Sequence, residues 1–163
     1  RNVVGSMDYT PVAFSDALYP HVTTYGHELA LPIIFESGWL HFADKPAAYY
    51  ALPDAALDYL RRIPVVWDET RLLAGEPGKF VLLARRRGED WYIAAINGQR
   101  TAQAVESPLS LLPEGRYQAV EIRDAEQPQK LTAGTRRIDH NDSIKITLQP
   151  FGGFVLLAMR LNN

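Results

Sequence analysis

Two patterns of apolar residues divide the chain near Pro64. Before that point the spacing predicts a helix from Thr24 to about Glu36, a helical turn that begins at Pro46, and a helix after Pro53 that ends at Arg62. After it, short apolar runs alternate with turn residues, and this is typical of strands. The strands are expected over residues 65–73, 79–87, 91–96, 102–111, 116–123, 135–139, 143–149 and 153–161.

The later strands predict an antiparallel β-sandwich of about eight strands over residues 65–163. Ile144, Ile146 and Leu148 alternate with polar residues, so that strand should bury one face. Asn97-Gly98 is a favoured pair for a tight hairpin. Short strands at steady spacing with glycine-rich turns favour a sandwich over a parallel sheet.

Residues 1–64 show a different unit, in which an apolar run ends on an aspartate. The runs are residues 2–11, with Asp8, and 39–44, with Asp44. A buried strand that ends on a carboxylate next to a helix is typical of parallel α/β sheets, whose ligands bind at the carboxyl ends of the strands. Two such units cannot cover their own faces and edges. We therefore expect residues 1–64 to be an incomplete part of a larger domain that needs the missing portion or self-association through this segment.

Composition excludes several classes of function. The chain has 163 residues, a net charge of -2 and 47% hydrophobic residues, so no basic surface for nucleic acid is expected. No apolar run approaches the roughly 18 residues of a membrane-spanning helix. Cysteine is absent, which excludes disulfides and thiolate metal sites.

The candidate binding residues each have a structural alternative. Asp8 could line a sugar site or hydrogen-bond the following loop, and Asp44 could bind substrate or serve as a helix N-cap. Tyr9 and Trp39 could stack on sugar rings, although core packing is the favoured interpretation for Trp39. For each of these residues, the sequence allows both the binding and the structural interpretation.

Three further groups look chemical but favour structural interpretations. His27 and His41 lack a second ligand at metal spacing. Residues 139–142 (Asp-His-Asn-Asp) fall between two strands and favour a turn. The run Arg85-Arg86-Arg87 is interpreted as the solvent-exposed tip of a hairpin.

Several motifs together resemble glycoside hydrolase family 97. They are the runs at residues 1–11 (RNVVGSMDYTP), 27–30 (HELA), 36–38 (ESG), 41–44 (HFAD), 66–71 (VWDETR), 75–79 (GEPGK) and 91–98 (WYIAAING). The resemblance covers the whole chain in order. Ser6 departs from the family pattern, which has proline there.

The resemblance implies an enzyme like an α-glucosidase or α-galactosidase, with a (β/α)8 barrel between two β-sandwiches. Residues 1–64 would be the last two βα units of the barrel, and residues 65–163 the C-terminal sandwich. It also implies a periplasmic or secreted location and a calcium ion held by glutamates. The catalytic and calcium-binding glutamates would lie upstream, so we expect no catalytic residue and no cofactor in this chain, and we give Glu28 and Glu36 no catalytic role.

The sequence thus predicts an inactive C-terminal part of a glycosidase that acts on an oligosaccharide, with Asp8, Tyr9 and Asp44 as substrate-binding candidates. Glucose or galactose preference, and retention or inversion, stay open. The alternative is a non-catalytic carbohydrate-binding or structural sandwich module. An exposed row of aromatic residues would favour that alternative, but Trp67, Phe80, Trp91 and Tyr92 fall in apolar strands.

Overall fold

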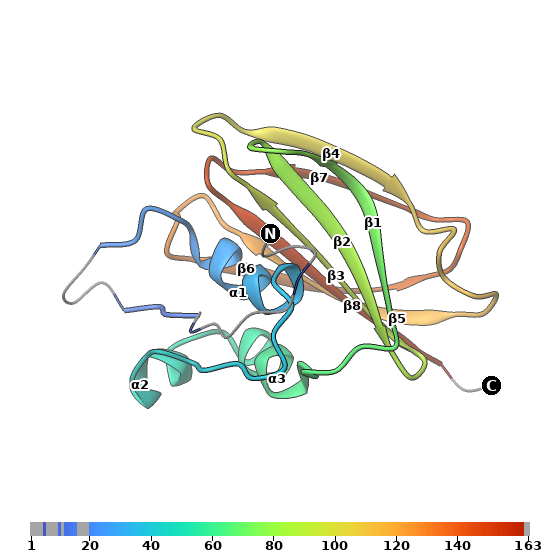
Figure 1. The fold of residues 1–163 in the computed structure, drawn as a ribbon, viewed down its shortest axis with the longest axis horizontal. Coiled ribbons are helices and arrows are strands. Elements are labelled where there is room, and N and C mark those ends of the chain that lie inside the picture. Colours follow the sequence, from blue (N-terminus) through green and yellow to red (C-terminus); the bar gives the residue numbers. More distant parts are fainter. Residues whose placement is uncertain (1–4, 6–9, 11, 16–19, 162–163) are drawn as a thin grey trace.

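A six-stranded antiparallel sheet in the order β1-β2-β3-β8-β5-β6 organises the fold (Figure 1). The computed structural model describes residues 5, 10, 12–15 and 20–161. A two-stranded sheet, β4-β7, covers one face of the large sheet, and the helices gather on the other. The elements are α1 (Tyr25–Ile34), α2 (Pro46–Tyr50), α3 (Asp54–Arg62), β1 (Glu69–Glu76), β2 (Phe80–Arg87), β3 (Asp90–Asn97), β4 (Gln103–Pro108), β5 (Tyr117–Asp124), β6 (Leu131–Ile138), β7 (Ser143–Leu148) and β8 (Gly153–Arg160).

All eight predicted strands are present, and all their pairings are antiparallel. The prediction for β7 is confirmed, because Ile144, Ile146 and Leu148 are buried while the residues between them are exposed. Four boundaries differ by three residues or more: β1 spans Glu69–Glu76 rather than residues 65–73, β4 ends at Pro108 rather than residue 111, and β6 begins at Leu131 rather than residue 135.

The predicted hairpin at Asn97-Gly98 is wrong. β3 pairs with β2 and β8, whereas β4 pairs with β7, so the chain crosses from one sheet to the other here. The Asn97 side-chain amide donates to the carbonyl oxygens of Thr101 (2.8 Å) and Gln149 (2.9 Å). Asn97 therefore holds the crossover in place, a contact between distant segments that a dipeptide preference does not encode.

The large sheet is buried on both faces, which gives the molecule two apolar layers. Trp91 and Ile93 of β3 pack toward β4-β7, while Tyr92 and Ala94 pack toward the helices. The second layer also contains Val12, Phe14, Leu29, Ile33, Tyr59, Leu83, Val155 and Leu157. Side chains from both sides of Pro64 share this layer. The domain boundary at Pro64 stays a prediction.

The helices begin where the sequence predicts. Thr24 is the N-cap of α1 and its hydroxyl accepts a hydrogen bond from the His27 amide, while Pro46 occupies the first turn of α2. α3 buries Ala56 and Leu60 and carries two arginines in its last turn. None of the described helices has the length and apolar character needed to cross a membrane.

The predicted strand over residues 39–44 does not form. Only Leu40 has a bridge pairing, and Trp39 is 70% exposed, so its predicted core packing is wrong. A parallel strand needs neighbours on both sides, and the described part of the chain supplies none there. The other predicted run, residues 2–11, falls almost entirely outside the described residues.

Candidate functional sites

Asp44 accepts four hydrogen bonds from its own chain. Its carboxylate accepts hydrogen bonds from the backbone amides of Phe14 (2.7 Å), Ser15 (2.6 Å) and Lys45 (2.7 Å), and from the Ser15 hydroxyl (2.8 Å). Burial opposes ionisation of Asp44, but these hydrogen bonds outweigh it and lower the pKa of the carboxyl group. Asp44 thus clamps residues 14–15 to the start of α2.

The N-cap alternative for Asp44 is wrong, because the N-cap of α2 is Lys45, which makes no side-chain capping bond. Substrate binding by Asp44 stays a prediction. Asp8 and Tyr9, the other two candidates, lie outside the described residues.

Aromatic residues surround the Asp44 clamp. The Tyr49 hydroxyl donates to the Val12 carbonyl (2.8 Å) and accepts the Asp44 amide (2.9 Å), and the Phe14 ring meets Tyr49 edge-on. Phe42, which is 40% exposed, stacks on Tyr49. Trp39 stacks on His41. Exposed aromatic and polar groups therefore lie together at this end of the helical layer.

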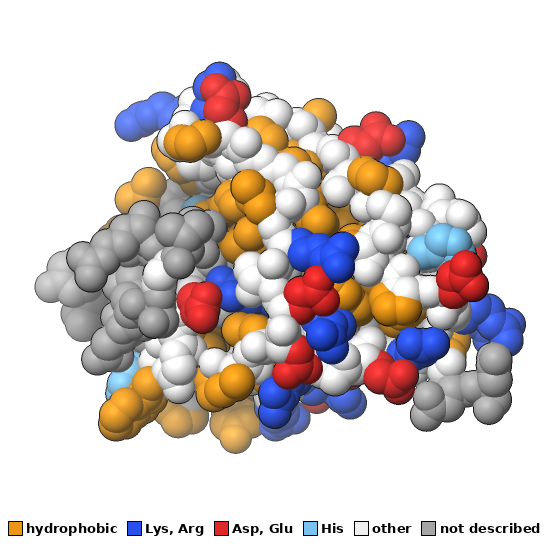
Figure 2. Space-filling model, turned by 45° about the vertical axis from the view of Figure 1, so that its right-hand side comes forward, with side chains coloured by type: hydrophobic (Ala, Val, Ile, Leu, Met, Phe, Trp, Pro, Cys, Tyr) orange, Lys and Arg blue, Asp and Glu red, His pale blue; other side chains and the backbone are white. Residues whose placement is uncertain are grey.

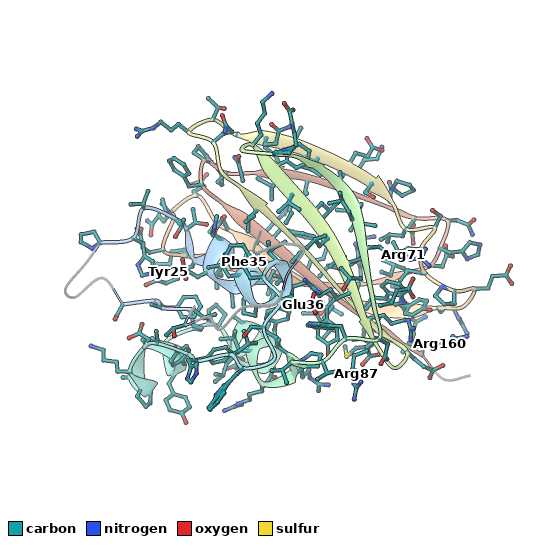
Figure 3. All side chains as sticks on the ribbon, viewed as in Figure 1. Tyr25, Phe35, Glu36, Arg71, Arg87 and Arg160 are labelled. Atoms are coloured by element: carbon teal, nitrogen blue, oxygen red, sulfur yellow. The ribbon has the colours of Figure 1, made fainter. Side chains whose placement is uncertain are left out.

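Arg85 is fully buried, so its interpretation as part of a solvent-exposed hairpin tip is wrong. Its guanidinium lies between β2 and the C-terminal end of α1. It donates to the Ile33 carbonyl (2.6 Å) and the Thr70 hydroxyl (2.8 Å), and it forms an ion pair with Glu36 (3.3 Å). Figure 3 shows Glu36 beside the sheet, where α1 ends.

The alternation of side chains along a strand could have revealed that Arg85 is buried. Arg85 lies two residues after Leu83, which packs toward the helices, and it shares that face of β2. Arg86 and Arg87 do lie at the surface, where both pair with Asp68. In the view of Figure 2, positive and negative side chains are interspersed rather than gathered into a patch of one sign.

Asp124 joins the beginning of α1 to the beginning of β8. Its carboxylate accepts the Thr24 hydroxyl (2.8 Å) and the amides of Gly26 (2.7 Å) and Gly153 (2.9 Å). Burial raises the pKa of Asp124, and these three hydrogen bonds act against that shift. A Cβ atom at Gly26 would lie 2.6 Å from an Asp124 oxygen, so glycine is required for this close approach. No local sequence signal predicts this junction, because the partners of Asp124 are about 100 positions or 29 positions away along the chain.

The histidines and the acidic turn do not form a metal site among the described residues, which contain no group of three or more suitable ligands. Residues 139–142 form the turn between β6 and β7, as predicted: the Asp139 amide donates to the Asp142 carboxylate (2.8 Å). Burial lowers the pKa of His27 to about 4.

The sandwich offers little that suits a sugar ring. Trp91 and Tyr92 are buried, and Trp67 and Phe80 are partly buried against the two apolar layers, so these four form no exposed aromatic row. A groove of about 970 Å³ opens between β7, β5 and β6, and its lining is polar and aliphatic, including Arg123, Lys130, Thr132, Lys145 and Gln149. Aromatic stacking, which sugar binding commonly uses, is absent from that lining.

A family profile and individual related proteins agree on the family to which this chain is similar. The profile described as "Glycosyl-hydrolase 97 C-terminal, oligomerisation" matches residues 66–159. A probable retaining alpha-galactosidase of Streptomyces bingchenggensis is 36% identical over 158 residues, which is 97% of this chain and 24% of that protein. The retaining alpha-galactosidase of Bacteroides thetaiotaomicron is 31% identical over 170 residues, covering 96% of this chain and 25% of that protein.

Solved structures agree with the sequence comparison. A glycoside hydrolase family 97 enzyme from Pseudoalteromonas sp. strain K8, in complex with acarbose, has a TM-score of 0.90 at 28% identity, over 97% of this chain and 27% of that one. A beta-arabinopyranosidase has a TM-score of 0.84 at 27% identity, over 96% of this chain and 26% of that one. The chain therefore spans about a quarter of the length of the relatives it matches.

Proposed function

Since this chain belongs to glycoside hydrolase family 97, we propose that it is the C-terminal part of an enzyme that cleaves α-glycosidic bonds of galacto- or gluco-oligosaccharides. The observation that carries the proposal is that the helical layer and the sandwich together resemble a family 97 enzyme, over 97% of the chain. The two relatives compared above are a retaining alpha-galactosidase and a probable one, which favours galactosides as substrates and retention as the outcome.

The helical layer is proposed to be the end of a catalytic (β/α)8 barrel. Four of the exposed large hydrophobic residues precede Pro64: Val22, Trp39, Phe42 and Tyr50, with exposed fractions of 80%, 70%, 40% and 70%. Exposed aromatic and aliphatic side chains of this kind are suited to an interface with another segment. Their exposure supports a role in packing against the rest of a barrel, in which residues 39–44 would gain strand neighbours.

The catalytic groups and a calcium ion are proposed to belong to the rest of that enzyme. The residues described here contain no cluster that fits a calcium ion, so we assign no step to it in this chain. Asp8, Tyr9 and Asp44 remain the proposed contacts to the sugar at the barrel rim. For Asp44 this would require an indirect role, since its carboxylate already positions the amides of Phe14 and Ser15.

The sandwich is proposed to bring copies of the enzyme together. The family description assigns oligomerisation to the domain that matches residues 66–159, so the sandwich rather than residues 1–64 is the better place for self-association. We also propose a periplasmic or secreted location for the enzyme.

Hydrolysis of nitrophenyl α-galactoside and α-glucoside tests the catalytic part of the proposal. An enzyme in which the barrel precedes this chain should release nitrophenol, and the 163-residue chain alone should not. Enzyme-like turnover by the chain alone would contradict the assignment of the catalytic groups to other segments. Failure of the longer enzyme on both substrates would contradict the proposed reaction.

A further inference from the structure

Among the described residues no strand pairs with the outer edge of β6, and the first five residues of β6 lack the usual protection against pairing. β6 ends the six-stranded sheet, and Thr132, Ala133, Gly134 and Thr135 are all exposed. No charged residue or proline occurs from Leu131 to Thr135, and the pairing of β6 with β5 runs without a bulge. Such an edge is a ready template for another strand.

The opposite edge, β1, has charged residues at both of its ends and a bulge, whereas β6 has charges only near its C-terminal end and no bulge. β1 contains Glu69, Arg71 and Glu76, and its register with β2 shifts between Leu72 and Ala74, which marks a bulge. Charges and bulges are the devices that natural sheets use to prevent edge-to-edge pairing. The two edges of this sheet therefore differ in their fitness for association.

No contact in the described part of one copy explains Gly134, in the middle of β6. Its φ is not in the left-handed region, and a Cβ atom added there would meet nothing within 4 Å. Glycine in a strand interior weakens the strand and often marks a place where another backbone approaches closely. The structure therefore points to an approach from outside.

The pattern of hydrogen bonds between β5 and β6 shows which backbone groups of β6 face outward, away from β5. The Ala125 amide donates to the Lys130 carbonyl (3.0 Å), and these two residues continue the β5-β6 register. Because hydrogen-bonded and non-hydrogen-bonded pairs alternate, Thr132, Gly134 and Arg136 bond to β5. The amides and carbonyls of Leu131, Ala133, Thr135 and Arg137 then face away from the sheet.

We propose that β6 pairs antiparallel with β6 of a second copy across a two-fold axis at Gly134, which joins two six-stranded sheets into one. This register puts Ala133 opposite Thr135 of the partner, and Leu131 opposite Arg137 of the partner. All of these residues face outward, so roughly eight backbone hydrogen bonds can form. The two copies of Gly134 meet as a non-hydrogen-bonded pair, where Cα atoms come within about 4.5 Å.

The charges of β6 are compatible with this register. Arg136 would lie opposite Thr132 of the partner, and its own charge is paired with Glu121 at 3.0 Å. Since no two like charges lie directly opposite one another, the arrangement avoids the repulsion that destabilises cross-strand pairs. The seam deepens the proposed oligomerisation role, on which it rests, and names the partner as a second copy of this chain.

Two substitutions test the seam by light scattering coupled to size-exclusion chromatography of the 163-residue chain. Ala133→Pro and Thr135→Pro each remove an amide that faces away from the sheet, without touching a bond to β5. Each should weaken association roughly 10- to 100-fold. Leu72→Lys, on the opposite edge, is the matched control and should leave association unchanged.

Thermal melting separates these effects from misfolding. Neither proline removes a hydrogen bond to β5, so the melting temperature of the single chain should change little in both variants. If the chain self-associates and both proline variants do so equally well, the seam is overturned while oligomerisation stands. Loss of association in Leu72→Lys alone would also overturn it. A wild-type chain that stays monomeric throughout the micromolar range would overturn the seam and the proposed oligomerisation together.

Discussion

The Nε atom of Arg85 in β2 donates a 2.6 Å hydrogen bond to the carbonyl oxygen of Ile33 in α1. Ile33 belongs to the last turn of α1, where carbonyl groups lack partners within the helix. A cation there also opposes the negative end of the helix dipole. This contact therefore fixes the C-terminal end of α1 to the sandwich and links the two sides of Pro64.

Replacing Arg85 with methionine should destabilise the chain by about 3 kcal/mol, because the Ile33 carbonyl and the Thr70 hydroxyl would lose their buried donor. The free energy of unfolding in urea measures the effect. Arg87→Met is the matched control: Arg87 is at the surface with an ion pair to Asp68, so its loss should change stability by no more than about 0.5 kcal/mol. Equal effects of the two substitutions would contradict the structural role of Arg85.

Gly153→Ala should separate α1 from the sheet. The added Cβ would overlap the backbone of Gly26 and His27, neither of which can move without shifting α1. Overpacking of this kind costs about 1–3 kcal/mol. Gly38→Ala, where a Cβ atom would meet nothing within 4 Å, should be tolerated. The melting temperatures of the two variants measure these effects. An unchanged value for Gly153→Ala would show that α1 is not packed tightly against the beginning of β8.

The strands of the sandwich were predictable because their pattern is local. In β7 the alternation of isoleucine and leucine with polar residues specifies both the strand and its buried face. The caps at Thr24 and Pro46 are local in the same sense. These features depend on neighbours within a few residues, and a sequence displays them directly.

Contacts between distant segments were not predictable in this way. Arg85 looked like a surface residue because its partners Ile33 and Glu36 come about 50 positions earlier. Asp124 similarly meets Thr24 across 100 positions. The predicted strand at residues 39–44 failed for a related reason, since a strand exists only where neighbours supply its hydrogen bonds.

Acid should destabilise the chain in part through His27. Burial lowers the pKa of His27 from 6.5 to about 4 in the folded chain. As the pH falls below 6.5, the unfolded chain binds a proton at this residue that the folded chain does not bind until about pH 4. Its stabilising contribution is therefore present above pH 6.5 and is lost as the pH falls toward 4, by up to about 1.4 kcal/mol per pH unit.

The substitution His27→Gln removes the titrating group, so the variant should lose less stability than the wild type between pH 6.5 and 4. Urea unfolding at several pH values within this window measures the two slopes. Identical slopes for the variant and the wild type would show that His27 ionises in the folded chain as it does in the unfolded one.

Asp44→Asn should loosen residues 14–15 while leaving the sandwich intact. One Asp44 oxygen accepts the amides of Phe14 and Ser15, and the other accepts the Ser15 hydroxyl and the Lys45 amide. An asparagine has one acceptor oxygen, and its amide NH2 group would replace the other. That NH2 group is a donor, so the backbone amides on that side would lose their acceptor. The loss, roughly 1–3 kcal/mol, is local to the clamp.

Amide hydrogen exchange resolves this effect by residue. The Phe14 and Ser15 amides should exchange roughly tenfold faster in Asp44→Asn, while amides of β3 keep their protection. Asp58→Asn, at an exposed position in α3, should change neither. Because the pKa of Asp44 is lowered by these bonds, its contribution to stability is present above the usual aspartate pKa of 3.8 and is lost as the pH falls through the lower folded value. Acid should therefore speed exchange at Phe14 and Ser15 in the wild type, and an unaltered exchange rate would show that the clamp does not hold this segment.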